Sequence, residues 1–564
     1  MPGPAAPFSE QSFDAIALEI FWNRLIAIMN EVDDAIVRTS FSTIVGESRD
    51  FAYILTDAGG RSLCQSTYSP PNFCVVLPIT AKHLLARFPV ETLREGDVLV
   101  TNDPWLGTGH LPDFVMISPV VRNGRAIAFV GSIAHVSDVG GHAGDIEALD
   151  VFQEGLRVPP SMLCRAGSPN EELFGLIAAN CRVPDLVLGD LKAMIGTHSI
   201  GIARLHELLD DYGLDDLEGF GGEIHRRSEA AMRERVGELQ DGTYRFALEI
   251  DGYSERVRLQ AAITISGDEV VVDYDGTSQA DPTAAINCVY NTTYASTMFP
   301  FKCALAPEIP NNEALFRPFR VTAPEGCILN ARFPAAVKTR AKVTNNLNQV
   351  IFGALWPLFG ERAQAGSGSI WPFTLRGDEP PFGRYVVDML PHGGRGATRT
   401  LDGMAPVAFP HNSVVTPCEI LESKAPILFL RKELRTDSGG AGRRRGGLGQ
   451  TIAFRHVGSE EMILSIIPDK IFAAAPGLDG GCDGERGVVR LNGRAIERFP
   501  AIHFRPGDEL ELELPGGAGF GPPSGREPER VLEDVALGYV SPEQALRDYG
   551  IAPSPQGGAR PAAG

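Results

Sequence analysis

Apolar and polar residues follow two different periods along this chain, and the changes between them mark its parts. From Asp14 the apolar positions recur every three or four residues, the spacing of one buried helix face; they are Ile16, Leu18, Phe21, Leu25, Ile28, Met29, Val32 and Ile36. Ser12, just before, can cap the first turn. The spacing therefore predicts a long amphipathic helix that ends near residues 38–39.

Short apolar runs bounded by turn residues follow this helix and are typical of a region that mixes strands and helices. Asn123–Gly124 is a dipeptide that favours a tight hairpin turn, and β-rich runs flank it on both sides. The elements that we expect here are strands at 51–56 and 96–100, a turn at 57–60, a helix at 77–90, and a hairpin of strands 114–120 and 126–133.

The pattern becomes helical again and then returns to the strand period in the second half of the chain. Clusters of glycine bound most of the later apolar runs, which favours strands joined by long loops. The expected parts are helices over 171–236 with a break at 180–185, alternating strands after 236, loops with one helix (343–358) over 280–360, a glycine-rich β region over 365–520, a helical pair at 528–549, and a disordered tail at 551–564.

A chain of 564 residues is too long for one hydrophobic core, so several domains are expected. The helical and strand spacings of apolar residues follow one another along the chain in an order that predicts an α+β, multidomain fold. The expected domains are a mixed α/β metal-binding domain (1–236), a mixed β/α middle domain (237–360), a β-rich domain with long glycine-rich loops (361–527), and C-terminal helices with a tail (528–564).

Composition excludes several classes of function. Asp and Glu number 71 against 51 Lys and Arg, so the formal charge is −20, which opposes binding to nucleic acid or to anionic membrane surfaces. The nine cysteines are spread singly without a CxxC pair, which favours reduced thiols over a disulfide framework. Neither a signal-peptide pattern nor an apolar run of about 18 residues is found. We therefore expect a cytoplasmic protein.

Metal-binding side chains concentrate between Thr101 and Asp145. His110 and Asp113 lie just before the first strand of the expected hairpin and His135 just after the second, so the hairpin brings all three to one end. Imidazole and carboxylate together suit a divalent ion such as Zn²⁺, Mn²⁺ or Fe²⁺, and three ligands leave positions open for chemistry. We predict these three residues as metal ligands.

Four more residues are candidates near this site. Asp138 and His142 lie where they could orient a ligand or transfer a proton during catalysis. Glu47, with Asp50 as the alternative, is a candidate fourth ligand from the loop before the first strand. Each also has a plainer interpretation, because His and Asp often cap glycine-rich turns and the two acidic residues could simply pair with Arg49.

Other motifs give weaker evidence for a catalytic or binding site. The loop TDSGGAGRRRGGLGQ (436–450) has glycines and arginines but not the order of a phosphate-binding loop, so a hairpin or a loop that faces an anion or a partner is the favoured interpretation. No GxSxG motif supports a serine hydrolase. Cys288 is interpreted as a buried inert thiol and not as a nucleophile.

The ordered motifs nevertheless resemble one family over nearly the whole length. They are GESRDFAYILTDAGGR, TNDPWLGTGHLPDF, IAHVSDVGG, FQEGLRVPP, DGTYRF, VDYDGTSQ, PEGCILNARFPAAV, LRTDSGGAGRRRGGLG, PGGAGFG and EPERVLEDVALGYVSPEQALRDYG. The chain is similar to the hydantoinase B/oxoprolinase family, which includes metal-containing subunits of hydantoinases, oxoprolinases, caprolactamase and ketone carboxylases. Where the family often has GGTHLPD this chain has GTGHLPD, which keeps the histidine and the aspartate.

The resemblance implies a division of labour between two chains. A partner ATPase subunit of the hydantoinase A type binds ATP and phosphorylates the substrate, and the present type of subunit completes the reaction at its metal. The metal ligands of the carboxylase relatives, a His-x-x-Asp pair and a later His, map onto His110, Asp113 and His135, and the family's acidic loop maps onto Glu47–Asp50. The chain is thus expected to act in a hetero-oligomer.

The function that the resemblance implies is ring opening of a cyclic amide such as a hydantoin, an oxoproline or a lactam. Water activated by the metal would attack the phosphorylated substrate, with Asp138 or His142 as proton acceptor. The alternative is a subunit of an ATP-dependent ketone carboxylase of the acetone or acetophenone type. A third interpretation is a non-catalytic scaffold whose His and Asp cluster is structural.

Overall fold

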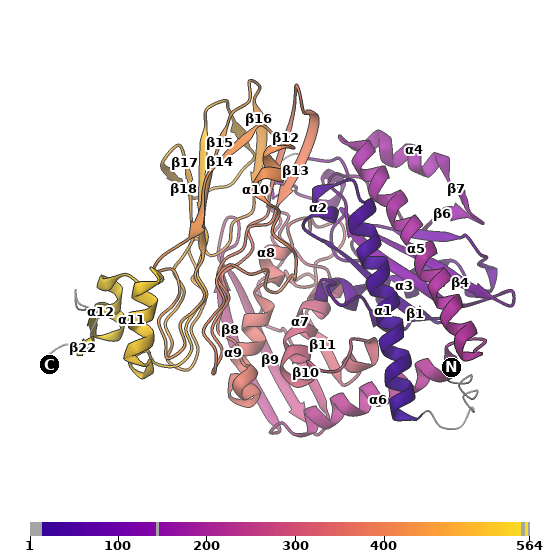
Figure 1. The fold of residues 1–564 in the computed structure, drawn as a ribbon, viewed down its shortest axis with the longest axis horizontal. Coiled ribbons are helices and arrows are strands. Elements are labelled where there is room, and N and C mark those ends of the chain that lie inside the picture. Colours follow the sequence, from indigo (N-terminus) through magenta and orange to yellow (C-terminus); the bar gives the residue numbers. More distant parts are fainter. Residues whose placement is uncertain (1–13, 143–145, 554–558, 562–564) are drawn as a thin grey trace, which may run out of the picture.

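The computed structural model describes residues 14–142, 146–553 and 559–561, and it has the expected α+β, multidomain fold (Figure 1). The predicted first helix is confirmed as α1 (Ala15–Thr39). The side chain of Asp14 caps its first turn by accepting a hydrogen bond from the Ile16 N–H. The capping proposed for Ser12 falls outside the described residues.

The N-terminal sheet has the strand order β2-β1-β5-β4-β3-β6-β7. Side chains on successive residues of β1 point to opposite faces, so Tyr53 packs with α1 and with α5 (Pro184–Tyr212), and Ile54 packs with α3 (Pro71–Arg87). The elements are β1 (Phe51–Asp57), β2 (Ser62–Gln65), β3 (Val98–Thr101), β4 (Asp113–Arg122), β5 (Arg125–His135), β6 (Ser161–Arg165), β7 (Ser168–Pro169), α2 (Thr43–Gly46) and α3 (Pro71–Arg87). Helices therefore cover both faces of this sheet, with α1 and α5 on one face and α3 on the other.

The predicted hairpin is confirmed, and its strands are longer than expected. β4 and β5 pair in antiparallel register around the turn at Asn123 and Gly124, both of which have positive φ. This register places Asp113, the first residue of β4, directly opposite His135, the last residue of β5. The hairpin thus delivers two of the predicted ligands to one sheet end.

The predicted helical region is confirmed, together with its break. It consists of α4 (Glu171–Asn180), α5 (Pro184–Tyr212) and α6 (Glu218–Gly237). Pro184 and Pro542 each stand in the first turn of a helix, where a missing N–H costs nothing. Short 3₁₀ segments connect other elements, namely η1 (Val90–Thr92), η2 (Val151–Gln153), η3 (Glu313–Phe316), η4 (Gly360–Arg362) and η5 (Pro523–Gly525).

The middle of the chain forms a sheet in the order β11-β10-β9-β8, covered by helices. One expectation is wrong here, because α7 (Tyr290–Leu305) occupies a segment predicted as loop. Its Thr and Asn residues and Pro300 are poor helix formers, and burial on most sides erases an amphipathic pattern, so tertiary packing decides its conformation. The other elements are β8 (Gly242–Ile250), β9 (Val257–Ser266), β10 (Glu269–Asp273), β11 (Phe319–Thr322), α8 (Ala341–Thr344) and α9 (Leu347–Phe359).

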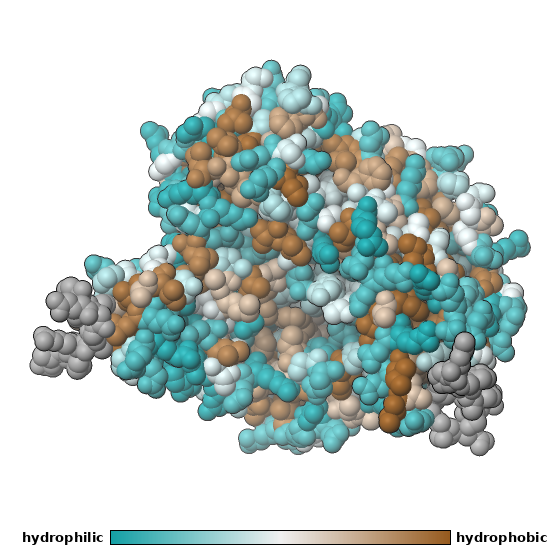
Figure 2. Space-filling view, in the orientation of Figure 1, coloured by the Kyte–Doolittle hydropathy of each residue, from teal (hydrophilic) through white to brown (hydrophobic). Residues whose placement is uncertain are grey.

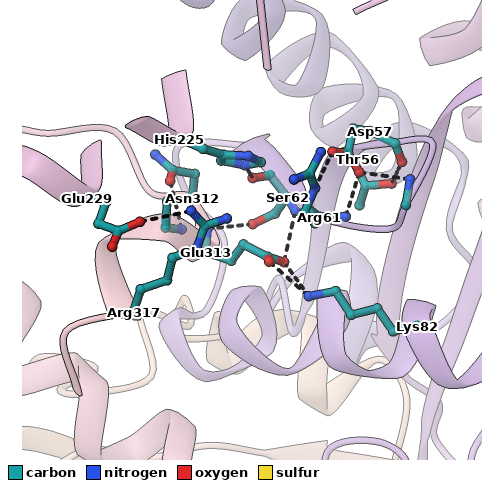
Figure 3. A network of polar contacts seen from close by, with 12 residues as sticks. Thr56, Asp57, Arg61, Ser62, Lys82, His225, Glu229, Asn312, Glu313 and Arg317 are labelled. Carbon is teal, nitrogen blue, oxygen red and sulfur yellow. Dashed lines mark hydrogen bonds and ion pairs between the residues drawn. The ribbon is translucent and has the colours of Figure 1, made fainter. Parts of the chain in front are cut away.

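A polar network joins the N-terminal sheet to the middle of the chain (Figure 3). Lys82 Nζ of α3 lies 2.9 Å from both carboxylate oxygens of Glu313, which belongs to η3. The Ser62 hydroxyl accepts the N–H of Glu313, and the Ser62 carbonyl is 2.8 Å from His225 Nε2 on α6. The two regions are therefore held by charge-assisted hydrogen bonds as well as by packing.

The C-terminal region contains two sheets, in the orders β13-β12-β16-β19 and β14-β15-β20-β17-β18, which share one apolar core around Trp371 and Phe454. This confirms the β-rich prediction. The elements are β12 (Phe373–Glu379), β13 (Gly383–Met389), α10 (Cys418–Glu422), β14 (Ile427–Leu434), β15 (Gln450–His456), β16 (Met462–Ile466), β17 (Val488–Leu491), β18 (Arg494–Ile496), β19 (Ile502–Phe504) and β20 (Glu509–Glu513).

Glycine-rich segments run side by side between these sheets and the C-terminal helices (Figure 1). Their backbones hydrogen-bond to one another, for example from Gly447 N–H to Arg395 O and from Gly517 N–H to Gly447 O, each 2.8–2.9 Å long. A Cβ on Gly447 would collide with the carbonyl oxygen of Met404. The repeated glycines are thus required by close backbone packing.

The predicted terminal helical pair is confirmed as α11 (Pro528–Ala536) and α12 (Pro542–Tyr549). The tail was expected to be disordered throughout, but β21 (Ile551–Pro553) pairs with β22 (Ala559–Pro561). Ile551 packs against Val531 and Ala545 of the helices, which supplies the apolar contact that orders this segment. Residues 554–558 and 562–564 lie outside the described residues.

No helix in the described part of the chain is both long and apolar enough to cross a membrane. On the face shown in Figure 2, apolar residues form small groups separated by polar ones. The expected cytoplasmic location stays a prediction, as does the division into four domains.

Candidate metal centre

The three predicted ligands converge at the open end of the hairpin. His110 Nε2 lies 2.8 Å from Asp113 Oδ1, and His135 Nδ1 lies 2.9 Å from the same oxygen. The two imidazole rings are 5.0 Å apart between centroids, and one ligand atom from each of the three residues lies within 4.8 Å of the others. Side chains from two chain segments therefore meet with their donor atoms close enough to share one ion.

The hydrogen bond of the second His110 nitrogen fits metal binding. His110 Nδ1 is 2.9 Å from the carbonyl oxygen of Lys338, and a carbonyl can only accept, so Nδ1 carries the hydrogen. Burial and the nearby Arg340 charge lower the pKa of His110 to about 4, so the ring is neutral. Nε2, which lies 2.8 Å from Asp113 Oδ1, is then the nitrogen that remains to bind a metal ion.

Asp113 is held from the opposite side as well. Its Oδ2 lies 3.0 Å from Arg340 Nη2 and accepts a hydrogen bond from the Thr108 hydroxyl at 2.5 Å. Burial alone would raise the pKa of Asp113, but His110, His135 and Arg340 together hold that pKa well below its usual range. Oδ2 is thus engaged by protein donors, whereas Oδ1 faces the two imidazoles.

His135 is the more basic of the two imidazoles. Burial lowers its pKa, but the hydrogen bond and charge of Asp113, together with the charges of Asp50 and Asp388, outweigh that effect and raise the pKa above its usual value. The surroundings of the trio therefore carry enough negative charge to compensate a divalent cation, with Arg340 offsetting part of it.

Backbone geometry of the Thr101 loop brings His110 to this place. Gly109 has a φ of +88°, a left-handed conformation that L side chains rarely adopt. A Cβ at this position would also collide with the Thr292 hydroxyl of α7, which donates a hydrogen bond to the Thr108 carbonyl at 2.7 Å. The glycine that precedes the histidine in GTGHLPD is therefore required by its close contact with α7.

The trio lies in a cavity of about 170 Å³ that is lined by all major regions of the chain. Sequence reasoning missed the residues contributed from the middle and C-terminal regions, among them Arg340, Asn345 and His411. Asn345 Oδ1 and His411 Nε2 are buried atoms without a hydrogen-bond partner among the described residues. No local motif marks these positions, because only the tertiary fold brings them to the cavity.

The structure separates the two candidates for a fourth ligand. Asp50 lines the cavity, and its Oδ2 is 4.0 Å from His135 Nδ1. Burial raises the pKa of Asp50 to about 6, although the charge of His135 opposes this. Glu47 is not among the residues that line the cavity, and Arg49 lies 3.9 Å from Asp33 and not beside the acidic pair. Asp50 is therefore the better placed candidate.

Asp138 and His142 have different surroundings. Asp138 lines the cavity, but its Oδ1 is 2.7 Å from Arg182 Nη1 and its Oδ2 accepts the Arg182 backbone N–H, so its carboxylate is already engaged. His142 is exposed and is not among the cavity-lining residues; its backbone N–H donates to the Gln153 carbonyl at 2.8 Å. Their catalytic roles stay predictions.

The remaining motifs have structural surroundings. Cys288 is fully buried, and burial raises the pKa of its thiol, as expected for an inert side chain. The loop at 436–450 is part of the glycine-rich array, where Arg445 Nε lies 3.2 Å from Asp534 of α11. The arginine thus binds a carboxylate of the chain itself.

Comparison with known proteins shows the family of the chain. The family model described as hydantoinase B/oxoprolinase matches residues 14–523. The chain belongs to this family. It is 29% identical to the caprolactamase subunit beta of Pseudomonas jessenii over 95% of this chain and 96% of that protein.

Two solved structures share the fold over nearly the whole chain. The ATP-dependent caprolactamase from Pseudomonas jessenii superposes with a TM-score of 0.87 at 27% identity, covering 97% of this chain and 98% of the other. A nucleotide-free acetone carboxylase structure superposes with a TM-score of 0.88 at 18% identity, covering 96% of this chain and 81% of the other. The second likeness concerns the fold alone. Membership in the hydantoinase B/oxoprolinase family supports an enzyme.

Proposed function

We propose that this member of the hydantoinase B/oxoprolinase family is the metal-containing subunit of an ATP-dependent hydrolase that opens cyclic amides. The observation that carries the proposal is the convergence of His110, Asp113 and His135 in a cavity of a chain that belongs to this family. The candidate substrates are a hydantoin, an oxoproline or a lactam. ATP would be bound by a partner subunit, since this chain lacks a phosphate-binding loop.

The residues of the chain fit the binding of a divalent ion. His110, Asp113 and His135 would hold it, with Asp50 as the candidate fourth ligand. Mn²⁺, Zn²⁺ and Fe²⁺ all suit a set of nitrogen and carboxylate donors. Such an ion supplies Lewis acidity, which acidifies water and polarises a carbonyl group.

Other groups would orient and bind the substrate. The Lys338 carbonyl fixes the His110 ring, and Arg340 fixes the Asp113 carboxylate, so the ligand geometry is set before substrate enters. Asn345 and His411 offer buried polar atoms for an amide group. For proton transfer Asp138 and His142 are retained as candidates; the Arg182 pair of Asp138 favours a role in positioning.

The partner subunit would supply the ATP site. A related protein carries the name caprolactamase subunit beta, which supports a complex of different subunits. In the proposed reaction the partner ATPase phosphorylates the amide oxygen, which turns a stable amide into a reactive electrophile. Water then attacks the former carbonyl carbon, and the C–N bond breaks as the nitrogen takes a proton, which leaves an acyl phosphate. A second water hydrolyses this acyl phosphate to the carboxylate and inorganic phosphate.

The test is co-expression with an ATPase subunit of the hydantoinase A type, followed by elemental analysis and a screen for ADP release with hydantoins, lactams and ketones, with and without bicarbonate. We expect ADP release and a ring-opened product that do not require bicarbonate. Strict dependence on bicarbonate with a ketone would favour the carboxylase alternative. A complex without stoichiometric metal would favour the scaffold interpretation.

A variant connects the site to this activity. His135→Ala should lose both metal and ring opening, whereas His83→Ala should keep both, because His83 is an exposed residue of α3. Retention of metal and activity in His135→Ala would disprove the site.

A further inference from the structure

The motif FQEGLRVPP contains a buried acid that the proposed function does not use. Glu154 directly follows η2 and is 1% exposed, and it is not among the residues that line the cavity. Its Oε1 accepts the backbone N–H groups of Val337 and Lys338 at 2.5 and 2.7 Å. Its Oε2 is buried without a hydrogen-bond partner among the described residues. Such burial is costly for a carboxylate, so a specific role is expected.

The two N–H groups belong to the segment that supports the metal ligands. The Lys338 carbonyl accepts the hydrogen bond from His110 Nδ1 at 2.9 Å. Arg340, two residues later, binds Asp113 Oδ2 at 3.0 Å and donates from Nε to the Thr108 carbonyl. One carboxylate oxygen thus anchors the start of a four-residue turn whose later atoms contact two of the proposed ligands.

We propose that Glu154 is a positioning residue of the metal centre, because its carboxylate fixes the turn from Val337 to Arg340 and thereby the orientation of His110 and Asp113. The inference rests on the proposed metal site. A single carboxylate oxygen that accepts two successive N–H groups fixes two peptide units at once. Partners that orient ligands in this way typically change metal affinity by about 10- to 100-fold when removed.

A second carboxylate provides a matched control. Glu379, at the end of β12 and 3% exposed, also accepts two successive backbone N–H groups, from Ser459 and Glu460, at 2.9 and 2.8 Å. It binds a turn of the C-terminal sheets and is not among the cavity-lining residues. Removal of either acid should cost stability, but only Glu154 is connected to the ligands.

The experiment measures the dissociation constants of Mn²⁺ and Zn²⁺ by competition with a chelator, using the full chain. Glu154→Ala should weaken binding about 10- to 100-fold. Glu154→Gln should remain within a few-fold of the wild type, since its amide oxygen can accept both N–H groups. Glu379→Ala should bind like the wild type although it unfolds at a lower temperature.

Glu154→Asp is included in case the alanine variant does not fold, because its shorter side chain keeps the charge but cannot reach both N–H groups. It should also weaken metal binding. Unchanged affinity in a folded Glu154→Ala or Glu154→Asp would overturn the positioning role, and so would an equal loss in Glu379→Ala. If the wild-type chain itself binds neither ion, the proposed metal site fails first, and that result is distinct from failure of the Glu154 inference alone.

Discussion

Arg340 binds the one carboxylate oxygen of Asp113 that does not face the two histidines, with Nη2 and Oδ2 3.0 Å apart and both side chains buried. The two oxygens of Asp113 therefore have separate tasks. Oδ2 fixes the carboxylate to the protein, and Oδ1 points to where an ion would be held.

Arg340→Met should destabilise the metal-free chain by about 3–5 kcal/mol, because a buried carboxylate loses its partner. The loss should become smaller when Mn²⁺ saturates the site, since the ion compensates the charge of Asp113. Urea unfolding with and without Mn²⁺ measures both. The exposed pair of Arg204 with Glu31 is the control, and Arg204→Met should cost at most about 1 kcal/mol with or without the ion. An equal loss at both Mn²⁺ levels for Arg340→Met would contradict the ligand role of Asp113.

Asp50→Asn should weaken metal binding by about 10-fold or more, because Asp50 faces the cavity beside His135. Glu47→Gln, three residues away and outside the cavity lining, should leave the affinity unchanged. Both are measured by chelator competition. The reverse order of effects would show that the acidic loop rearranges when the ion binds.

His411→Ala should reduce kcat/KM of the assembled enzyme by about 10- to 100-fold without a change in metal content, because its buried Nε2 lines the cavity and has no hydrogen-bond partner among the described residues. Steady-state kinetics and elemental analysis of the same preparation test this. His83→Ala on the exposed face of α3 serves as the control. Loss of the metal from His411→Ala would instead indicate a ligand.

His198 should make the chain sensitive to acid. Its ring nitrogens lie 2.8 and 2.7 Å from the hydroxyls of Ser118 and Ser132, and burial lowers its pKa to about 3. Between that value and the ordinary pKa of 6.5, the unfolded chain binds a proton that the folded chain does not. Stability should therefore fall as the pH drops below 6.5, by up to about 1.4 kcal/mol per pH unit from this group.

The measurement is the thermal midpoint between pH 7.5 and pH 5 for the wild type and for His198→Gln. The variant should be less stable at pH 7.5 but should lose less on acidification. Parallel pH profiles of the two proteins would show that His198 titrates alike in both states.

Gly447→Ala should prevent correct folding or cost several kcal/mol, because the added Cβ would collide with the Met404 carbonyl in the glycine-rich array. Gly222→Ala is the matched control. Nothing lies within 4 Å of a Cβ at that position in α6, so this change should stabilise the chain by up to about 1 kcal/mol. Thermal unfolding compares the two. Equal stability of both variants would disprove the packing argument.

The elements predicted well from sequence are those whose conformation is determined by neighbouring residues in the chain. The spacing of apolar residues in α1 and the Asn123–Gly124 turn are read from neighbouring positions, and the hairpin then explains why Asp113 and His135 meet. α7 was missed because its helix depends on burial from all sides and not on propensity.

The residues of the candidate site likewise fall into those that could be predicted from sequence and those that could not. His110, Asp113 and His135 belong to one short stretch, so their spacing was informative. Arg340 and His411 reach the same cavity from positions more than 200 residues later, and no period or motif connects them to it. The choice between Glu47 and Asp50 likewise depended on side-chain direction, which sequence does not specify.

The Lys338 carbonyl that orients His110 lies about two hundred residues beyond the hairpin. A ribosome therefore releases all three ligand residues long before it has synthesised the atoms that hold them in place. During that interval the growing chain would bind ions loosely and with little preference. Tight loading would begin only once the middle of the chain has docked, so occupancy of the centre would report that the segment around Lys338 has folded against the hairpin.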